Sequence, residues 1–204
     1  MPRSGRKTTD SRDNRLIGKT QKLCNQLRPA PSPSGLDKVR RLIWGVVQAT
    51  LYKWSPVPFH GWRRLLLRLF GAHIGSGAHP YASAQIWAPW NLKMGPRSCL
   101  GPRSICYSVA QVTLAEDAIV SQGAHLCTAT HDHRDPLFTL FVGDIEIGTS
   151  SWVSADAFIG PGVKVGDRAV IGARAVVVRD VLPETVVVGN PARIVSRFGK
   201  SIPQ

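Results

Sequence analysis

The most regular hydrophobic pattern in the chain repeats every six residues between Ile147 and Val177. Glycine follows four of the five aliphatic residues that open the successive hexads, which are Ile147, Val153, Ile159, Val165 and Ile171. An α-helix repeats at about 3.6 residues and a plain strand at two, so neither accounts for a period of six. Hexapeptide repeats are typical of a parallel β-helix. We expect each aliphatic residue to point into a shared core, and each glycine to supply unusual φ values at a corner.

Weaker hexads precede this stretch. They begin at Ile74, slip by two residues near Lys93, and resume at Met94, Leu100, Cys106, Val112, Ala118 and Ala124. Residues 130–146 contain no hexads, and excursions from a regular repeat often carry function. The pattern predicts an all-β core: a parallel β-helix over residues 73–189 with an active-site loop at 130–146. Residues 190–204 are expected to close the domain, with one turn of helix.

Helical spacing replaces the hexads near the N-terminus. Apolar residues recur at helical intervals over residues 36–53, Pro56 and Pro58 interrupt them, and a second short helix is predicted over residues 61–70. Two hypotheses fit this amphipathic segment, residues 36–72. It covers the open end of the β-helix, as solenoid ends require, or it lies on anionic lipid; one helix could serve each role.

Charge is divided unevenly along the chain. Residues 1–70 hold 15 Lys and Arg against three acids, a net charge of +12, whereas residues 71–204 are almost neutral at +1. This division argues against a basic nucleic-acid groove on the β-helix and leaves peripheral membrane contact through residues 1–70 open. Residues 1–35 are rich in Arg, Lys, Ser and Pro, which predicts a basic, disordered tail.

Targeting signals are not evident. The first 35 residues have no apolar core of a signal peptide, and no apolar run reaches the roughly 20 residues that span a bilayer. The four cysteines lack the C-x-x-C spacing of metal or redox sites. We expect a cytoplasmic protein, with peripheral attachment to the inner face of the membrane as an open alternative.

Three motifs together carry a family resemblance: Thr130-His131-Asp132, Trp152-Val153, and Gly189-Asn190-Pro191-Ala192-Arg193. With the helical entry at 60–71 and the coil at 86–92, the chain resembles the hexapeptide-repeat acyltransferases. Within them it is similar to the colanic-acid-type exopolysaccharide O-acetyltransferases. The resemblance implies a left-handed coil, a homotrimer, and acetyl-CoA bound between subunits without a metal. The acceptor would be a sugar or a lipid-linked glycan, in exopolysaccharide, capsule or related glycan biosynthesis.

The resemblance also implies site residues. His131 stands where the family has its catalytic histidine, and Ala155 and Ala173 would line the CoA arm with backbone groups. Arg179, in place of a family lysine, and Arg193 would contact the CoA phosphates. Ser108 and Val109 stand where galactoside enzymes have acidic acceptor-binding groups, so the acceptor is expected to be a different sugar.

The chemistry of acetyl transfer agrees with a histidine in this loop. A base must remove the proton of the attacking hydroxyl, and imidazole titrates near neutral pH. His131 is the candidate general base, oriented by Asp132 or another nearby acceptor. His133 could face the acceptor or solvent, and Trp152 could stack on a substrate or pack at a subunit contact.

Two alternatives remain open from the residues. His125, His131 and His133 could hold zinc in an enzyme similar to the γ-type carbonic anhydrases, since three ligands and a water make a catalytic site. The β-helix could also be a rigid scaffold without catalysis.

Overall fold

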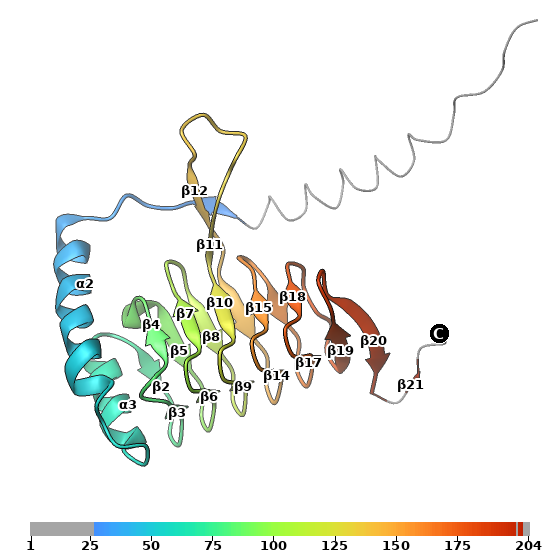
Figure 1. The fold of residues 1–204 in the computed structure, drawn as a ribbon, viewed down its shortest axis with the longest axis horizontal. Helices are drawn as coiled ribbons and strands as arrows, with labels where there is room; N and C mark the ends of the chain where they lie inside the picture. The colour runs from blue at the N-terminus through green and yellow to red at the C-terminus, as the bar shows by residue number, and fades with distance from the viewer. Residues whose placement is uncertain (1–26, 199, 202–204) are drawn as a thin grey trace, which may run out of the picture.

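A computed structural model describes residues 27–198 and 200–201. Most of the expected disordered tail, residues 1–26, therefore lies outside the described residues. The described chain is a parallel β-helix with helices at one end and an arm projecting from its side (Figure 1). This confirms the predicted fold class.

Short parallel strands stack into three flat faces. The first face contains β2 (His73–Ile74), β5 (Leu92–Met94), β8 (Val112–Leu114), β13 (Ile145–Ile147) and β16 (Lys164–Val165). The second face contains β3 (His79–Pro80), β6 (Cys99–Leu100), β9 (Ile119–Val120), β14 (Trp152–Val153), β17 (Val170–Ile171) and β19 (Thr185–Val188). The third face contains β4 (Gln85–Ile86), β7 (Ile105–Tyr107), β10 (His125–Cys127), β15 (Phe158–Ile159) and β18 (Val176–Val177).

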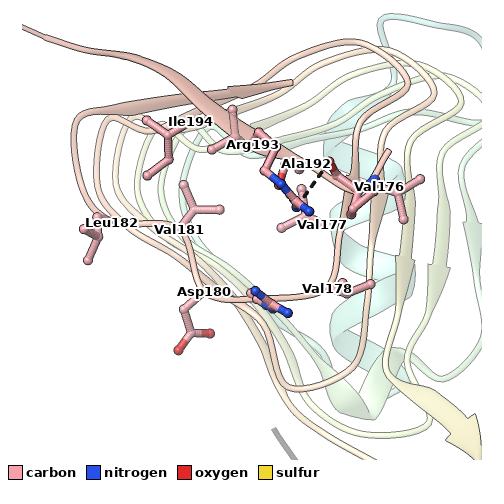
Figure 2. A pocket seen from close by; sticks show the side chains of 12 residues that line it. Val176, Val177, Val178, Asp180, Val181, Leu182, Ala192, Arg193 and Ile194 are labelled. Carbon is pink, nitrogen blue, oxygen red and sulfur yellow. Dashed lines mark hydrogen bonds between the residues drawn. The ribbon is translucent and has the colours of Figure 1, made fainter. Parts of the chain in front are cut away.

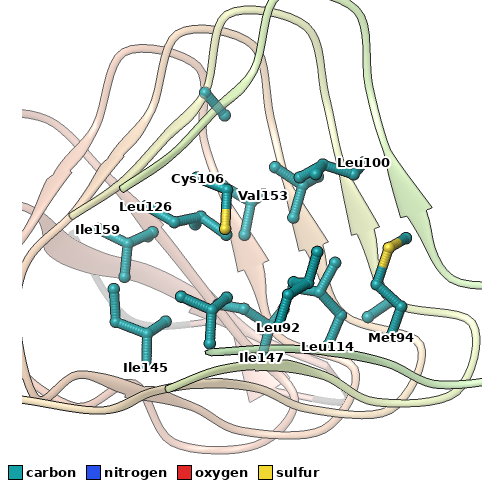
Figure 3. Packing of buried hydrophobic residues seen from close by; sticks show 14 of the residues in the cluster. Leu92, Met94, Leu100, Cys106, Leu114, Leu126, Ile145, Ile147, Val153 and Ile159 are labelled. Carbon is teal, nitrogen blue, oxygen red and sulfur yellow. The ribbon is translucent and has the colours of Figure 1, made fainter. Parts of the chain in front are cut away.

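The hydrophobic core fills the interior of the coil. Each strand of the coil turns one or two side chains inward, most of them aliphatic, so that residues one coil apart stack in rows, as Met94, Leu114 and Ile147 do on the first face (Figure 3). Their side chains are at most 2% exposed. Each coil is hydrogen-bonded to its neighbours through the backbone of its strands. The six-residue period therefore fixes both the spacing of the strands and the positions of the buried side chains.

The frame of the early hexads differs from the prediction. Two-residue insertions occur at two corners between the third and first faces. One is the 3-10 turn η2 (Pro89–Asn91), just before Lys93 as expected, and the other is at residues 108–111. Beyond it the inward strand positions are Leu114, Val120 and Leu126, two residues later than the frame of Val112, Ala118 and Ala124. The hydrophobic pattern alone does not reveal this shift, because Val112, Ala118 and Ala124 are buried as well.

The glycine after each aliphatic residue has a different role from the one expected. The left-handed φ values fall two positions later, at residues such as Asp117 (φ 56°), Ser150 (φ 54°) and Asp156 (φ 57°). A Cβ on Gly148 would instead lie 2.7 Å from the backbone nitrogen of Asp167 in the next coil. Glycine is therefore required here by close approach between coils.

The non-repeating loop is an arm of antiparallel strands. β11 (Ala129–His131) pairs with β12 (Leu140–Val142), and the coil resumes at Ile145, slightly before the predicted end of the loop. β1 (Arg28–Pro29), from the segment expected to be disordered, adds a third strand by pairing with β12. The chain between β1 and the helices thus runs from the arm to the end of the coil (Figure 1).

The predicted helices cover the first coil. α2 (Gly35–Val47) begins with a capping box between Ser34 and Asp37, continues into the π-helical turn η1 (Gln48–Tyr52), and is followed by α3 (His60–Leu69). Trp44, Tyr52 and Leu67 belong to the main hydrophobic core. This packing confirms the capping hypothesis. Among the described residues, no helix is both long enough and apolar enough to cross a bilayer.

The C-terminal segment is a strand where a turn of helix was expected, so that prediction was wrong. β20 (Arg193–Arg197) pairs antiparallel with β19, and β21 (Lys200–Ser201) pairs with β20. The antiparallel pairing ends the coil, because β20 occupies the edge on which a further parallel strand would stack.

Candidate functional site

The arm projects from the same edge of the three-sided coil as the two corner insertions. Residues 87–91, residues 108–111 and the arm at 129–144 are successive connections from the third face to the first. The strands on either side stack in register, so these three elaborated corners lie next to one another. Residues that are far apart in the sequence are therefore close together at this edge.

His131 lies on the arm, at the end of β11. Its Nδ1 is 2.7 Å from the main-chain oxygen of Phe138, and its ring stacks on the Phe138 ring with centroids 4.4 Å apart. A carbonyl oxygen can only accept, so this bond places the proton on Nδ1 and leaves Nε2 as the basic nitrogen. Asp132 accepts instead from the backbone N–H of Arg134. The orienting acceptor is therefore a backbone group.

Strand alternation determines which way His131 faces. Directly paired residues of an antiparallel sheet share a face, so His131, Leu140, Ala129 and Val142 lie on one side of the arm. Leu140, Ala129 and Val142 pack against the corner that precedes the arm, in a small cluster with Ala110. The catalytic candidate is thus on the face of the arm that turns toward the inserted corners.

A pocket of about 450 Å³ opens on this side of the arm. It is lined by residues of five segments: β1 and the chain after it (Arg28 and 31–33), α2 (Asp37 and Arg41), the two inserted corners (within 87–91 and 108–111), and β12 (Val142). Trp87 and Trp90 provide aromatic walls, with the Arg41 guanidinium carbon 5.5 Å from the Trp87 ring centroid. Aromatic rings beside polar groups are suited to a sugar, which has apolar faces and a hydroxyl rim.

An ion pair holds β1 against the arm. The Arg28 Nη2 is 2.9 Å from Asp144 Oδ1, and the same carboxylate accepts the backbone N–H of Gln111. Partial burial raises the pKa of Asp144, but the bonds from Arg28 and Gln111 outweigh it, so the pKa lies below its ordinary value. The carboxylate stays charged at neutral pH and ties β1, the arm and a corner together.

A second pocket, of about 550 Å³, lies at the C-terminal end of the coil. It brings Arg179, from the loop after β18, together with Arg193, at the start of β20. Figure 2 shows Ala192 and Arg193 on one side of the opening and Val178 and Asp180 on the other. Two guanidinium groups suit phosphate, although the carboxylate of Asp180 also lines the pocket.

The remaining predicted CoA residues lie along the neighbouring edge. Ala155 and Ala173 occupy successive turns between the second and third faces, and the Ala155 oxygen accepts the N–H of Arg174 at 2.9 Å. Trp152 lies three residues before Ala155, half-exposed on β14, with its Nε1 2.8 Å from Ser121 Oγ. The third face thus separates this edge from the edge that carries the arm and Arg179.

The three histidines considered as zinc ligands are not gathered. His125 is on β10, edge-on to Phe158 with ring centroids 5.4 Å apart, and partial burial lowers its pKa. His131 and His133 are both exposed on the arm. Within residues 27–198 and 200–201, no three His, Cys, Asp or Glu side chains come together as metal ligands.

Sequence reasoning missed the pocket beside the arm. Trp87, Trp90 and Arg41 were assigned to a coil and to a helix, and only the folded chain brings them to one place. The two-residue slip near Lys93 was the signal that could have located them, because an inserted corner on the same edge as the arm lies beside it.

Comparison with known proteins places the chain in a family. No family model matches it. A protein of Escherichia coli (strain K12), provisionally named colanic acid biosynthesis acetyltransferase WcaF, is 37% identical over 161 residues, which cover 79% of this chain and 88% of that protein. A protein of Staphylococcus aureus (strain MRSA252), provisionally named acetyltransferase SAR2635, is 30% identical over 118 residues, which cover 56% of this chain and 59% of that protein.

Solved structures share the fold. A maltose O-acetyltransferase from Clostridium difficile 630 has a TM-score of 0.71 at 23% identity, covering 84% of this chain and 90% of that one. A hexapeptide-repeat acetyltransferase of Vibrio cholerae with acetyl-CoA has a TM-score of 0.71 at 20% identity, with 84% and 91% covered. A galactoside acetyltransferase in complex with CoA has a TM-score of 0.75 at 18% identity, with 91% and 98% covered. The shared architecture is the left-handed parallel β-helix.

Proposed function

The chain belongs to the hexapeptide-repeat acetyltransferases, in the group that includes WcaF, and from that membership we propose that it moves the acetyl group of acetyl-CoA to a sugar hydroxyl. His131 is the general base. The observation that carries this assignment is the bond from His131 Nδ1 to the Phe138 oxygen, which leaves Nε2 as the basic nitrogen, on the face of the arm shared with Val142, a residue of the pocket lining.

The transfer proceeds by direct attack. Nε2 of His131 takes the proton of the sugar hydroxyl while its oxygen adds to the thioester carbonyl, forming a tetrahedral oxyanion. Collapse of that intermediate forms the ester and breaks the C–S bond. The leaving thiolate takes a proton from the imidazolium, which returns the base to its starting state. The step needs no acyl-enzyme.

Acetyl-CoA would bind in a groove between adjacent subunits, along the third face, which carries Arg179 at one edge and Ala155 and Ala173 at the other. Arg179 and Arg193 hold its phosphates, and the turns at Ala155 and Ala173 present backbone groups to the pantetheine arm. The shared C-terminal pocket of the two arginines supports this placement.

The acceptor, a sugar or a lipid-linked glycan, would enter the pocket beside the arm. Trp87 or Trp90 would stack on the sugar ring, and Arg41 would meet its polar rim. His133 lies two residues after His131, in the turn of the arm. Maltose and galactoside acetyltransferases share the fold, which supports a carbohydrate acceptor, and the name of WcaF supports a role in exopolysaccharide or related glycan biosynthesis.

A homotrimer would complete the site. The outward row of the first face is mostly charged, including Lys93, Glu146 and Lys164, as expected for solvent. The outward row of the second face carries Ile119 and Trp152, which are 46% and 48% exposed. Apolar rows of this kind mark a surface that a neighbouring subunit covers.

The test is an assay of CoA release with a panel of nucleotide-linked and lipid-linked sugars. We expect His131→Ala to lower kcat by about 10²–10⁴, the usual contribution of a general base, with acetyl-CoA binding unchanged by calorimetry. His73→Ala, an exposed histidine on the first face, is the control and should keep the wild-type rate. Wild-type turnover by His131→Ala would exclude this mechanism.

A further inference from the structure

α2 presents its apolar side to solvent. The charged residues Asp37, Arg40 and Arg41 are only partly exposed and face the protein. Trp44, the only buried residue of the helix, and the partly buried Val47 are the apolar residues on the inner side. The residues that face outward are Leu36, Val39, Leu42, Ile43 and Val46, each at least 50% exposed. A surface helix of a globular protein normally has the opposite arrangement, with its polar face in water.

The exposed apolar surface continues over η1, the following loop and α3. Its outward members there are Leu51, Trp54, Val57, Phe59, Trp62, Leu65 and Leu69. We call these residues and the five outward residues of α2 the outer helix surface. It holds twelve of the 23 large hydrophobic residues that are exposed in the described chain, within 34 positions. This density sets it apart from the singly scattered apolar residues of an ordinary surface.

A groove gives this surface depth. It has a volume of about 490 Å³ and lies between η1 and α3, lined by Leu51, Trp54, Phe59 and Trp62 among others. The Trp62 Nε1 bonds to the Leu51 oxygen at 3.0 Å, which holds the two helical elements in one continuous face. Trp54, at 81% exposure, is the most exposed aromatic side chain of the group. Tryptophan is the residue that favours the boundary between lipid and water.

The charges around the outer helix surface are positive. Lys38, Lys53 and Arg68 are exposed at its margins. Asp37 is the only acid between residues 35 and 70, and it is engaged in the capping box with Ser34. Long basic side chains can lie along apolar atoms while their charged ends remain at the level of lipid phosphates.

We propose that the outer helix surface docks on a bilayer that contains anionic lipid. An apolar helical face with basic margins has the chemistry of a helix that lies in the membrane interface. A second copy of this chain fits less well, because two such surfaces would bring like charges together at their margins. α2 would thus have two partners, with Trp44 packed in the β-helix core and Leu42 in the lipid.

The position of α2 connects docking with the acceptor pocket. Asp37 and Arg41 line that pocket from the inner side of the helix whose outer side carries Leu36 and Leu42. This consequence rests on the proposed function: a glycan attached to a membrane lipid would reach the pocket from the surface on which the protein docks.

The test is flotation of the full chain with vesicles of phosphatidylcholine alone and with added phosphatidylglycerol. Binding is expected to the anionic vesicles and to weaken with salt. Leu42→Ser with Trp54→Ser should reduce the partition coefficient by at least about tenfold, since both side chains lose their burial in lipid. Lys38→Gln with Lys53→Gln should reduce binding roughly tenfold on anionic vesicles only.

Phe198→Ser is the matched control, because this exposed aromatic residue lies beyond the last coil, away from the helices, and should bind as wild type. Wild-type binding by the Leu42/Trp54 variant would overturn the proposal and assign lipid binding to another part of the chain. Failure of the wild type to bind either vesicle would also overturn it. A fall in the mass of the assembly in that variant, without a change in vesicle binding, would assign the surface to a second copy. None of these measurements uses enzyme activity, so the proposed function stands or falls separately.

Discussion

Hydrogen bonds to backbone groups orient the side chains of His131 and Asp132 on the arm. The imidazole of His131 is held by the carbonyl of Phe138, seven positions along the chain. β11 and β12 bring these two residues together across the hairpin, so pairing of the arm sets the tautomer. Asp132, the neighbouring carboxylate, stabilises the turn of the arm through the N–H of Arg134. The proposed role of His131 as base therefore needs no carboxylate partner, because the strand pair supplies the acceptor.

The two arginines of the C-terminal pocket allow a test at this scale. We expect Arg179→Gln and Arg193→Gln each to raise the KM for acetyl-CoA about tenfold or more, the effect of losing one hydrogen bond to a charged group. kcat should change little, because neither side chain reaches the reacting carbon. Steady-state kinetics with acetyl-CoA measures both constants.

Acetyl-pantetheine, which lacks the nucleotide phosphates, provides the discriminating comparison. Both variants should use it as well as the wild type does. Arg168→Gln is the control, since Arg168 is exposed in a different turn and pairs with Glu184. An equal loss with both donors would show that the arginines stabilise the fold and do not bind phosphate.

At the scale of the element, one coil of the β-helix requires two special positions in each hexad. The residue after the inward aliphatic side chain lies against the next coil, and the residue two positions later has a left-handed φ, as at Gly148 and Ser150. The sequence places glycine at the first position and often a polar residue at the second. Steric contact thus selects glycine more strongly than backbone conformation does.

A pair of glycines separates these two causes. A Cβ at Gly148 would meet the Asp167 backbone nitrogen at 2.7 Å, whereas the nearest atom to a Cβ at Gly160 is the Val177 oxygen at 3.4 Å. Gly148→Ala should lower the free energy of unfolding by about 1–3 kcal/mol, the usual cost of overpacking. Gly160→Ala should cost less than about 1 kcal/mol, and urea denaturation compares the two. Equal costs would mean that the coils can move apart at no energetic expense.

At the scale of the whole molecule, the first and second faces of the coil differ in what they present outward. The first face presents charged side chains and the second presents Ile119 and Trp152. If the second face forms the subunit contact, Ile119→Asp should convert an assembly with three times the mass of one chain into single chains, because it buries an unpaired carboxylate. Light scattering after size exclusion measures the mass.

Lys93→Asp introduces the same side chain on the first face and should leave the assembly intact. Acetyl-CoA binding should weaken together with assembly in Ile119→Asp, because the donor groove would lie between subunits. If Ile119→Asp keeps both the mass of the assembly and acetyl-CoA binding, the second face is not the subunit contact.

The sequence by itself determined the coil and the residue that interrupts it. The six-residue period predicts a β-helix because each coil must place one aliphatic side chain inward at every face, and the break in that period drew attention to His131. Only the tertiary structure decided the rest. The pocket is formed by the chain beside β1, α2, the two inserted corners and β12. The closing strand depends on pairing of β20 with β19, and attachment of β1 to the arm depends on the ion pair of Arg28 with Asp144. These contacts join residues as much as 116 positions apart, and no local pattern records which distant segments will share an edge. The inverted polarity of α2 became visible for the same reason: periodicity indicates that a helix has two faces, and packing decides which one is left uncovered.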